Sequence, residues 1–250
     1  LVEFGNRAHV CHGSYLDARK FLADLGRDQV AGIVMDLGLS SMQLDQAERG
    51  FSFRFDAPLD MRFDPTSGQT AADLVNKLDE QELADIIWRF GEERFSKRIA
   101  RQIVTNRPFA TTLELANVVR SAVGRTRERQ DQATRTFQAL RIAVNQELQT
   151  VERAIPELID LLQPKSRLAI ISFHSLEDRL IKQAFRLASR DCICPPEQMV
   201  CTCDHQASVK VLTPHPVLPT EGEVNQNPRA RSAKLRVVEK ISFGMKAAGS

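Results

Sequence analysis

The sequence predicts an α/β fold that is interrupted by a helical segment. Two short apolar runs, Val30–Met35 and Arg167–Phe173, have the length and composition of buried strands. A helix-like stretch precedes the first run and another follows the second, and strands that alternate with helices pair as a parallel sheet. A chain of 250 residues is long enough for one large domain or for a domain that carries an insert.

The first forty residues follow a strand, helix, strand pattern. Ala8–Cys11 is predicted to be a strand in which Cys11 is buried, Tyr15–Leu25 a helix, and Val30–Met35 a strand that ends at Asp36. Ligands of open α/β sheets bind at the carboxyl edge of the strands, so Asp36 is a candidate site residue. A carboxylate at this position also suits a helix N-cap or a turn.

The middle of the chain changes from a loop to helices. Residues 41–69 have no periodicity and are predicted to be a long ordered loop. Asp79 with Glu82 and Thr111 with Glu114 have the spacing of capping boxes, which marks two helix starts. The helices define an insert at 70–130, between a first part of the α/β domain at 1–69 and a second part at 131–250.

The second α/β part begins with the strongest helical pattern of the chain. Apolar residues repeat at spacings of three and four from Thr134 to Val151, and the helix is predicted to end at Pro156. A further helix is predicted at Leu176–Leu187 and a last strand at Lys234–Lys240.

The charge is distributed unevenly. Residues 89–141 hold 12 Lys and Arg against 5 Asp and Glu, whereas residues 1–88 hold 8 against 15. Arg94, Arg98 and Arg101 fall on one face of a predicted helix, and this basic segment suits a phosphate backbone. A solvated helical surface is the alternative interpretation.

The composition predicts a cytoplasmic protein. Apolar residues make up 42% of the chain, and no apolar run approaches the roughly 20 residues of a membrane span. The first residues, Leu1–Phe4, show neither an initiator Met nor a secretory signal, so we expect that an N-terminal segment is missing.

Four of the five cysteines form two closely spaced pairs, Cys192 with Cys194 and Cys201 with Cys203. Paired thiols at this separation can converge on one tetrahedral zinc ion, and His205 could replace one ligand. Reduced free thiols in a loop are the alternative, because a cytoplasmic disulfide is disfavoured.

Several segments resemble one family of enzymes, in the same order along nearly the whole chain. They are 36–45 (DLGLSSMQLD), 49–53 (RGFSF), 59–62 (LDMR), 137–145 (FQALRIAVN), 173–179 (FHSLEDR) and 227–236 (NPRARSAKLR). Together they resemble the RsmH (MraW) family of bacterial 16S rRNA (cytosine-N4)-methyltransferases.

The resemblance implies a class I methyltransferase fold of the Rossmann-like kind, with a helical insert. It implies S-adenosylmethionine as cofactor and methylation of a cytosine N4 in the decoding region of the small ribosomal subunit. The cofactor positions of the family fall on Tyr15, where an aromatic face would contact the adenine, and on Asp36 and Gln43.

One feature of the family is absent from the sequence. The family's first strand carries a glycine-rich turn and its second ends in an acidic residue for the ribose, but the glycines before Asp36 are scattered. Glycine lets the backbone approach the cofactor closely. We therefore expect that the first strands are missing and that the chain by itself binds the cofactor weakly.

Methylation of N4 requires a particular environment, because the lone pair of the amine is delocalised into the ring. The site must accept a hydrogen bond from the amine and align it with the methyl group. Asp36, His174, Glu177 and Asp178 are the candidates, although a structural role for His174 is equally expected. A flipped base also needs an apolar pocket, to which residues 51–55 with their three Phe side chains could contribute.

One other function fits parts of the sequence, and a second does not. A non-catalytic RNA-binding or ribosome-assembly module could use the basic insert together with Arg229 and Arg231. A DNA amino-methyltransferase would show Asp/Asn-Pro-Pro-aromatic where this chain has Asp36–Leu39. We therefore expect 16S rRNA, and not DNA or a membrane, to be the partner.

Overall fold

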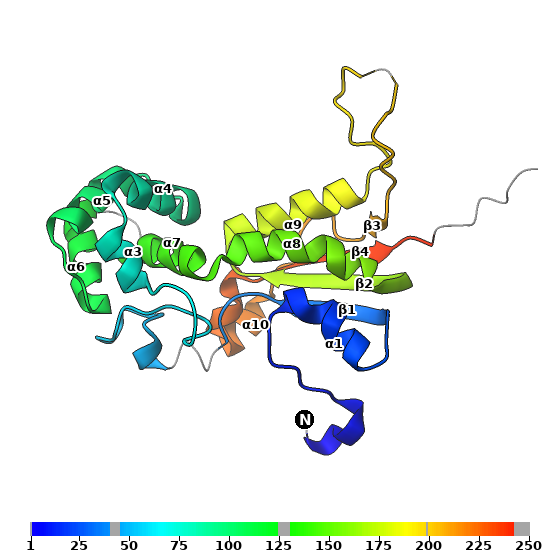
Figure 1. Ribbon diagram of the computed structural model, residues 1–250, viewed down its shortest axis with the longest axis horizontal. Coiled ribbons are helices and arrows are strands. Elements are labelled where there is room, and N and C mark those ends of the chain that lie inside the picture. The colour runs from blue at the N-terminus through cyan, green and yellow to red at the C-terminus, as the bar shows by residue number, and fades with distance from the viewer. Residues whose placement is uncertain (1, 41–45, 125–130, 199, 243–250) are drawn as a thin grey trace, which may run out of the picture. The chain divides into compact units, whose positions relative to one another are not determined.

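The chain forms two compact units (Figure 1). The computed structural model describes residues 2–40, 46–124, 131–198 and 200–242. An α/β unit consists of Leu1–Gly38 and Leu148–Ser250, and a helical unit consists of Leu39–Glu147. Each unit has a hydrophobic core of its own.

The α/β unit contains a four-stranded sheet of order β1-β2-β4-β3. The strands are β1 (Val30–Asp36), β2 (Leu162–Ser172), β3 (Val209–Val211) and β4 (Lys234–Lys240). β1 and β2 are parallel, whereas β4 runs antiparallel to both β2 and β3. The predicted α/β fold is confirmed, and three of these strands fall where the sequence pattern placed them.

Three helices, α1 (Ala18–Asp24), α8 (Glu147–Asp160) and α9 (Ser175–Ala188), share one core with the sheet. Met35, Leu168 and Ile170 contribute to this core from the strands, whereas Val34, on the other face of β1, is 73% exposed. The remaining short elements of the unit are η1 (Val2–Arg7), η2 (Tyr15–Asp17), α10 (Glu221–Gln226) and η4 (Pro228–Ser232).

The helical unit is built from η3 (Ala47–Arg49), α3 (Ala71–Lys77), α4 (Glu80–Gly91), α5 (Ser96–Thr105), α6 (Thr112–Val123) and α7 (Ala133–Asn145). Both predicted capping boxes are present, at the starts of α4 and α6. The unit extends beyond the predicted insert at 70–130, because Leu59, Met61 and Phe137 lie in the same core as α4, α5 and α6.

The loop that precedes α3 is held against α7. Asn145 Nδ2 donates to the carbonyl of Met61 (2.7 Å), and the backbone N–H of Phe63 donates to Asn145 Oδ1 (2.6 Å). Arg49 Nη2 donates to the carbonyl of Arg62 at 2.8 Å. Over its described part, this segment is therefore the long ordered loop that the sequence predicted.

Four local predictions are wrong. Residues 8–12 form no strand, and Cys11 is exposed. The long predicted helix breaks at Gln146, which has a φ of 49°, and Pro156 lies inside α8 instead of ending it. Apolar spacing does not reveal such breaks, because α7 and α8 continue the same periodicity while they belong to different units.

The three Phe side chains of residues 51–55 lie in no strand, and Phe51 and Phe53 pack against the core of the helical unit. The ring centroids of Phe51 and Phe63 are 5.9 Å apart. Those of Phe53 and Phe137 are 4.7 Å apart, and these two rings meet edge-on. Phe55 is 66% exposed.

In the described residues, no helix is long and apolar enough to cross a membrane.

The close packing of the loop that precedes α3 can be tested by substitution at Gly50. A Cβ at this position would lie 2.2 Å from the carbonyl oxygen of Pro58, and its φ is +69°. We expect Gly50→Ala to lower the free energy of unfolding by about 3 kcal/mol, from the strained φ and the backbone clash together. Urea unfolding followed by circular dichroism measures the loss.

Gly68→Ala is the matched control, because Gly68 has a φ of +79° but no atom within 4 Å of the added Cβ. It should show the cost of the φ angle alone, about 1 kcal/mol. Equal losses in the two variants would contradict the close approach at Gly50.

Candidate active site and RNA-binding surface

The carboxyl ends of β1 and β2 lie side by side and lead into two of the predicted site segments, at Asp36 and at His174. Asp36 pairs with Ile171 in the parallel register, and the N–H of Leu37 donates to the carbonyl of Ile171 at 3.0 Å. β2 therefore leads into Phe173 and His174 next to the end of β1. β4 begins opposite Ser172, so the segment that precedes β4 reaches the same edge.

Asp36 ends β1 with its side chain exposed, directly after the buried Met35. Residues 37–40 are not helical, so Asp36 does not cap a helix. No hydrogen bond or ion pair is found for its carboxylate within the described parts of the chain. The carboxylate is therefore accessible at the ligand edge of the sheet.

α1 runs antiparallel to β1 (Figure 1), and Tyr15 lies in η2, directly before α1. Residues 25–29 join the two elements, so the start of α1 lies towards the end of β1. Ser14 caps this start, with Oγ accepting from the N–H of Leu16 at 3.2 Å. Tyr15 is 36% exposed while Leu16 packs against the core. Gln43, the third predicted cofactor residue, lies outside the described residues.

His174 and Glu177 form the capping box of α9. His174 Nδ1 accepts from the N–H of Glu177 at 3.3 Å, and Glu177 Oε2 accepts from the N–H of Phe173 at 2.9 Å. Glu177 is buried, and its Oε1 lies 3.2 Å from His174 Nε2. Helix capping thus engages both residues, and a ligand at this edge would meet a fixed imidazole ring.

Asp178 is paired with Arg236 of β4. The guanidinium donates through Nε at 2.6 Å and through Nη2 at 3.2 Å, and Lys234 Nζ lies 3.7 Å from the carboxylate. Burial raises the pKa of Asp178, but the hydrogen bonds and charge of Arg236 outweigh it, so the pKa lies below its usual value. This bidentate pair ties α9 to β4.

Arg229 and Arg231 lie on η4, in the segment that leads into β4. Both side chains are exposed, whereas Ala230 between them is buried. Asn227 Oδ1 accepts from the N–H of Arg229 at 3.2 Å, which fixes the start of the turn. The buried alanine holds two cationic side chains outwards near the carboxyl edge.

Of the predicted basic stripe, Arg98 and Arg101 lie on the solvent side of α5, whereas Arg94 precedes this helix, which begins at Ser96. Ile99 and Ile103 are buried, while Arg94, Arg98 and Arg101 are exposed. A groove of about 420 Å³ lies between α4 and α5, and Trp88, Arg94, Lys97 and Arg98 contribute to its lining. Arg101 does not line it and instead pairs with Glu80 at 3.3 Å.

Trp88 is the residue of this groove that sequence reasoning missed. It is the only tryptophan of the chain and is 57% exposed. On α4 it follows the buried Ile87 and lies one turn beyond the buried Ala84. This position next to the apolar stripe does not distinguish a core residue from an exposed aromatic side chain. Arg94 stacks on Phe95 at 4.7 Å, which adds a second aromatic ring to the groove.

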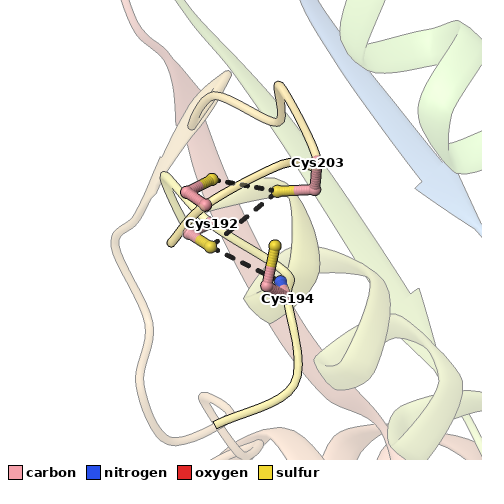
Figure 2. Close-up of side chains that lie close together, drawn as sticks. Cys192, Cys194 and Cys203 are labelled. Carbon is pink, nitrogen blue, oxygen red and sulfur yellow. Dashed lines mark hydrogen bonds between the residues drawn. The ribbon is translucent and has the colours of Figure 1, made fainter. Parts of the chain in front are cut away.

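The four cysteines converge in the loop between α9 and β3 (Figure 2). Cys203 Sγ lies 3.6 Å from Cys201 Sγ and 3.8 Å from Cys192 Sγ. The N–H groups of Ile193 and His205 lower the pKa of Cys203 to about 6. The N–H of Cys194 favours the Cys192 thiolate, but the neighbouring thiols outweigh it and raise the pKa of Cys192 to about 12.

Comparison with known proteins defines the class of this chain. Residues 1–241 match the model of the MraW methylase family. The chain belongs to this family, and the predicted family is thus confirmed. A methylase family also agrees with S-adenosylmethionine as methyl donor.

The relatives carry one common name. The chain is 52% identical to a protein from Geobacter sp. (strain M21) over 96% of this chain and 79% of the relative. It is 49% identical to a protein from Thermomicrobium roseum, over 93% of this chain and 72% of the relative. It is 47% identical to a protein from Brevibacillus brevis, over 96% of this chain and 78% of the relative. Each is named ribosomal RNA small subunit methyltransferase H.

The Asp178–Arg236 pair makes stability depend on pH. We expect Asp178→Asn to lower the free energy of unfolding at neutral pH by about 2 kcal/mol, because Arg236 loses its charged acceptor. The folded-state pKa of Asp178 is lowered, so the stabilisation is present above the unfolded pKa of about 3.9 and is lost as the pH falls through the folded value. Urea unfolding at a series of pH values should show the two proteins converging in acid.

Glu239→Gln is the control for this measurement. Glu239 of β4 pairs with Arg167 of β2 at 3.2 Å, but the Arg167 side chain is 65% exposed. The variant should lose less than about 1 kcal/mol. A loss for Asp178→Asn no larger than this, or one that persists unchanged in acid, would show that the Asp178–Arg236 pair does not stabilise the fold in this way.

Proposed function

We propose that this protein transfers a methyl group from S-adenosylmethionine to N4 of a cytidine in the decoding region of 16S rRNA. The relatives' common name supports the small-subunit rRNA as substrate, which would place the activity in the cytoplasm. The observation that carries the proposal is the accessible carboxylate of Asp36 at the carboxyl edge of a parallel strand pair, in a chain of a methylase family.

The residues at this edge fit an adenosine-containing cofactor. Tyr15, directly before α1, presents an exposed aromatic face, and Asp36 presents a carboxylate that can accept from a hydroxyl or an amine. S-adenosylmethionine would supply the electrophilic methyl group. We propose that Tyr15, Asp36 and Gln43 bind it.

The chemistry of the base defines a second role for the same edge. The N4 amine becomes nucleophilic when an acceptor orients its N–H, so that the lone pair points at the methyl group. Asp36 is the accessible acceptor, and the capped His174, Glu177 and Asp178 follow the adjacent strand. We propose that Asp36 contacts the reactants and that His174 bounds the base pocket, while Glu177 and Asp178 position this segment.

The groove between α4 and α5 is proposed to bind the RNA. Its cationic side chains, together with those of Arg101, Arg229 and Arg231, can neutralise phosphates. Trp88 can stack on an unpaired base, which is how proteins usually hold single-stranded RNA. The cysteine cluster is proposed to hold a metal ion that takes no part in methyl transfer.

Asp36→Ala tests the proposed chemistry. Its side chain is exposed, so we expect an unchanged free energy of unfolding but a loss of methyl transfer to small-subunit particles of at least about 100-fold. Loss of a cofactor contact should appear in the apparent affinity for S-adenosylmethionine, measured by calorimetry. Loss of the amine acceptor should appear in kcat at saturating cofactor.

Asp28→Ala is the control, because Asp28 is an exposed aspartate just before β1, at the opposite end of this strand. It should retain full activity. Near-normal turnover of Asp36→Ala would mean that the catalytic role lies with the His174 segment, and His174→Ala should be made in parallel.

If the groove binds RNA, its cationic side chains and Trp88 should contribute to the affinity in ways that differ in their salt dependence. Replacing Arg94, Lys97 and Arg98 together by Ala should weaken binding and flatten its salt dependence by about one unit of slope for each lost phosphate contact. Trp88→Ala should weaken binding by about 1–3 kcal/mol with an unchanged salt slope, because stacking releases no counterions. Filter binding at several salt concentrations separates the two.

Lys77→Ala is the control for the charge effect. Lys77 is an exposed cation of the same unit, outside the groove, and it pairs with Asp73 at 2.7 Å. Its loss should change neither affinity nor slope. A triple variant that keeps the original slope would show that the stripe is only a solvated surface.

A further inference from the structure

The loop that joins α9 to β3 has no core of its own. It spans residues 189–208, and none of its described residues is fully buried. Loops of this length without regular structure are uncommon in compact domains, since ordering each residue costs roughly 1–2 kcal/mol of backbone entropy. Some other interaction must hold the chain in one conformation.

Among the described residues of this loop, the hydrogen bonds to the α/β unit come from its base. The N–H of Ser208 donates to the carbonyl of Ala188 at 2.8 Å, and His205 Nε2 lies 3.0 Å from the carbonyl of Leu187. The N–H of Ala207 donates to Asp191 Oδ1 at 3.3 Å. These contacts close the base, but they do not fix the part of the loop between Cys192 and Cys203.

In this part the four thiols lie within 4.8 Å of one another. A Zn–S bond of about 2.3 Å in a tetrahedron separates the sulfurs by about 3.8 Å. The observed separations from Cys203 Sγ, 3.6 Å to Cys201 and 3.8 Å to Cys192, match this edge length. They are much longer than the roughly 2.05 Å of a disulfide bond.

Backbone donors also point at the sulfurs. The N–H of Ile193 donates to Cys203 Sγ and the N–H of Cys194 to Cys192 Sγ, each at 3.4 Å. Such N–H···S contacts orient thiolate ligands and disperse their charge around a bound metal ion. Figure 2 shows the labelled sulfurs of Cys192, Cys194 and Cys203 turned towards one another.

We propose that Cys192, Cys194, Cys201 and Cys203 bind one zinc ion that staples the loop between α9 and β3. His205 is not included, because four thiols already supply four ligands and its Nε2 lies 3.0 Å from the carbonyl of Leu187. Four thiolates complete the tetrahedron and leave no open position for water or substrate. Binding deprotonates whichever ligands are still thiols, and their protons pass to solvent.

The place of the cluster supports a structural role. α9 starts beside the carboxyl edge at Ser175 and ends at Ala188, so its 14 residues span about 21 Å. The cysteine loop follows the far end of this helix (Figure 1). The zinc ion would therefore act on the fold of the loop and not on methyl transfer.

Metal analysis of the purified chain tests the proposal directly. After expression in zinc-supplemented medium and gel filtration, mass spectrometry of the metals should find about one zinc per chain. A mercurial reagent that titrates thiols should release this zinc as the four cluster thiols react. Cobalt(II) in its place should give the charge-transfer and visible bands of tetrahedral thiolate coordination.

Variants locate the ion. Cys192→Ser and Cys203→Ser should each bring zinc well below one per chain, whereas Cys11→Ser should keep it, since Cys11 is an exposed cysteine outside the cluster. Should a cluster variant fail to fold, the wild-type chain gives the same information. Stripping its zinc should accelerate tryptic cleavage after the exposed Arg190, and adding zinc back should reverse this.

Three outcomes would overturn the proposal. They are a folded wild-type chain with no zinc and five reactive thiols, a disulfide within the cluster in the protein as isolated, and a Cys11→Ser variant that loses as much zinc as the cluster variants. None of these outcomes bears on the proposed methyl transfer, which is measured separately on small-subunit particles.

Discussion

The parallel pairing of β1 with β2 is the constraint on which the site depends. It aligns Asp36 with Ile171, so that the chain leaving β1 and the chain leaving β2 emerge side by side. The antiparallel entry of β4 opposite Ser172 adds a third segment to the same edge. A slip of one residue would turn the side chain of Asp36 to the other face of the sheet.

The ion pair between Asp178 and Arg236 holds the start of α9 against β4, next to this edge. It joins the first turn of α9 to a buried position of β4, with the capping box of His174 and Glu177 directly before it. The start of α9 is therefore fixed by charge, by capping and by the sheet. A rigid edge of this kind can hold two reactants in line, which is the main requirement for transferring a methyl group to a weak nucleophile.

The helical unit is held together differently, by contacts between segments that are far apart in the sequence. Asn145 of α7 bonds to Met61 and Phe63 of the loop, more than eighty residues earlier in the chain. At Gly91, a Cβ would lie 2.6 Å from the carbonyl oxygen of Arg135, so α4 and α7 approach closely there. α4 is therefore packed closely against α7. The groove with Trp88 lies between α4 and the start of α5.

The sequence by itself determined the α/β class, the strand that ends at Asp36, the capping boxes of α4 and α6 and the paired cysteines, because these features depend on local spacing and residue type. Its resemblance to the methylase family determined the expected reaction. Only the tertiary structure decided that Cys11 is exposed, that the helix breaks at Gln146, and that Trp88 faces a groove. It also showed that the sulfurs of four cysteines separated in sequence lie within 4.8 Å of one another. The physical reason is that burial and convergence are set by contacts between segments far apart in the chain, which local periodicity does not record.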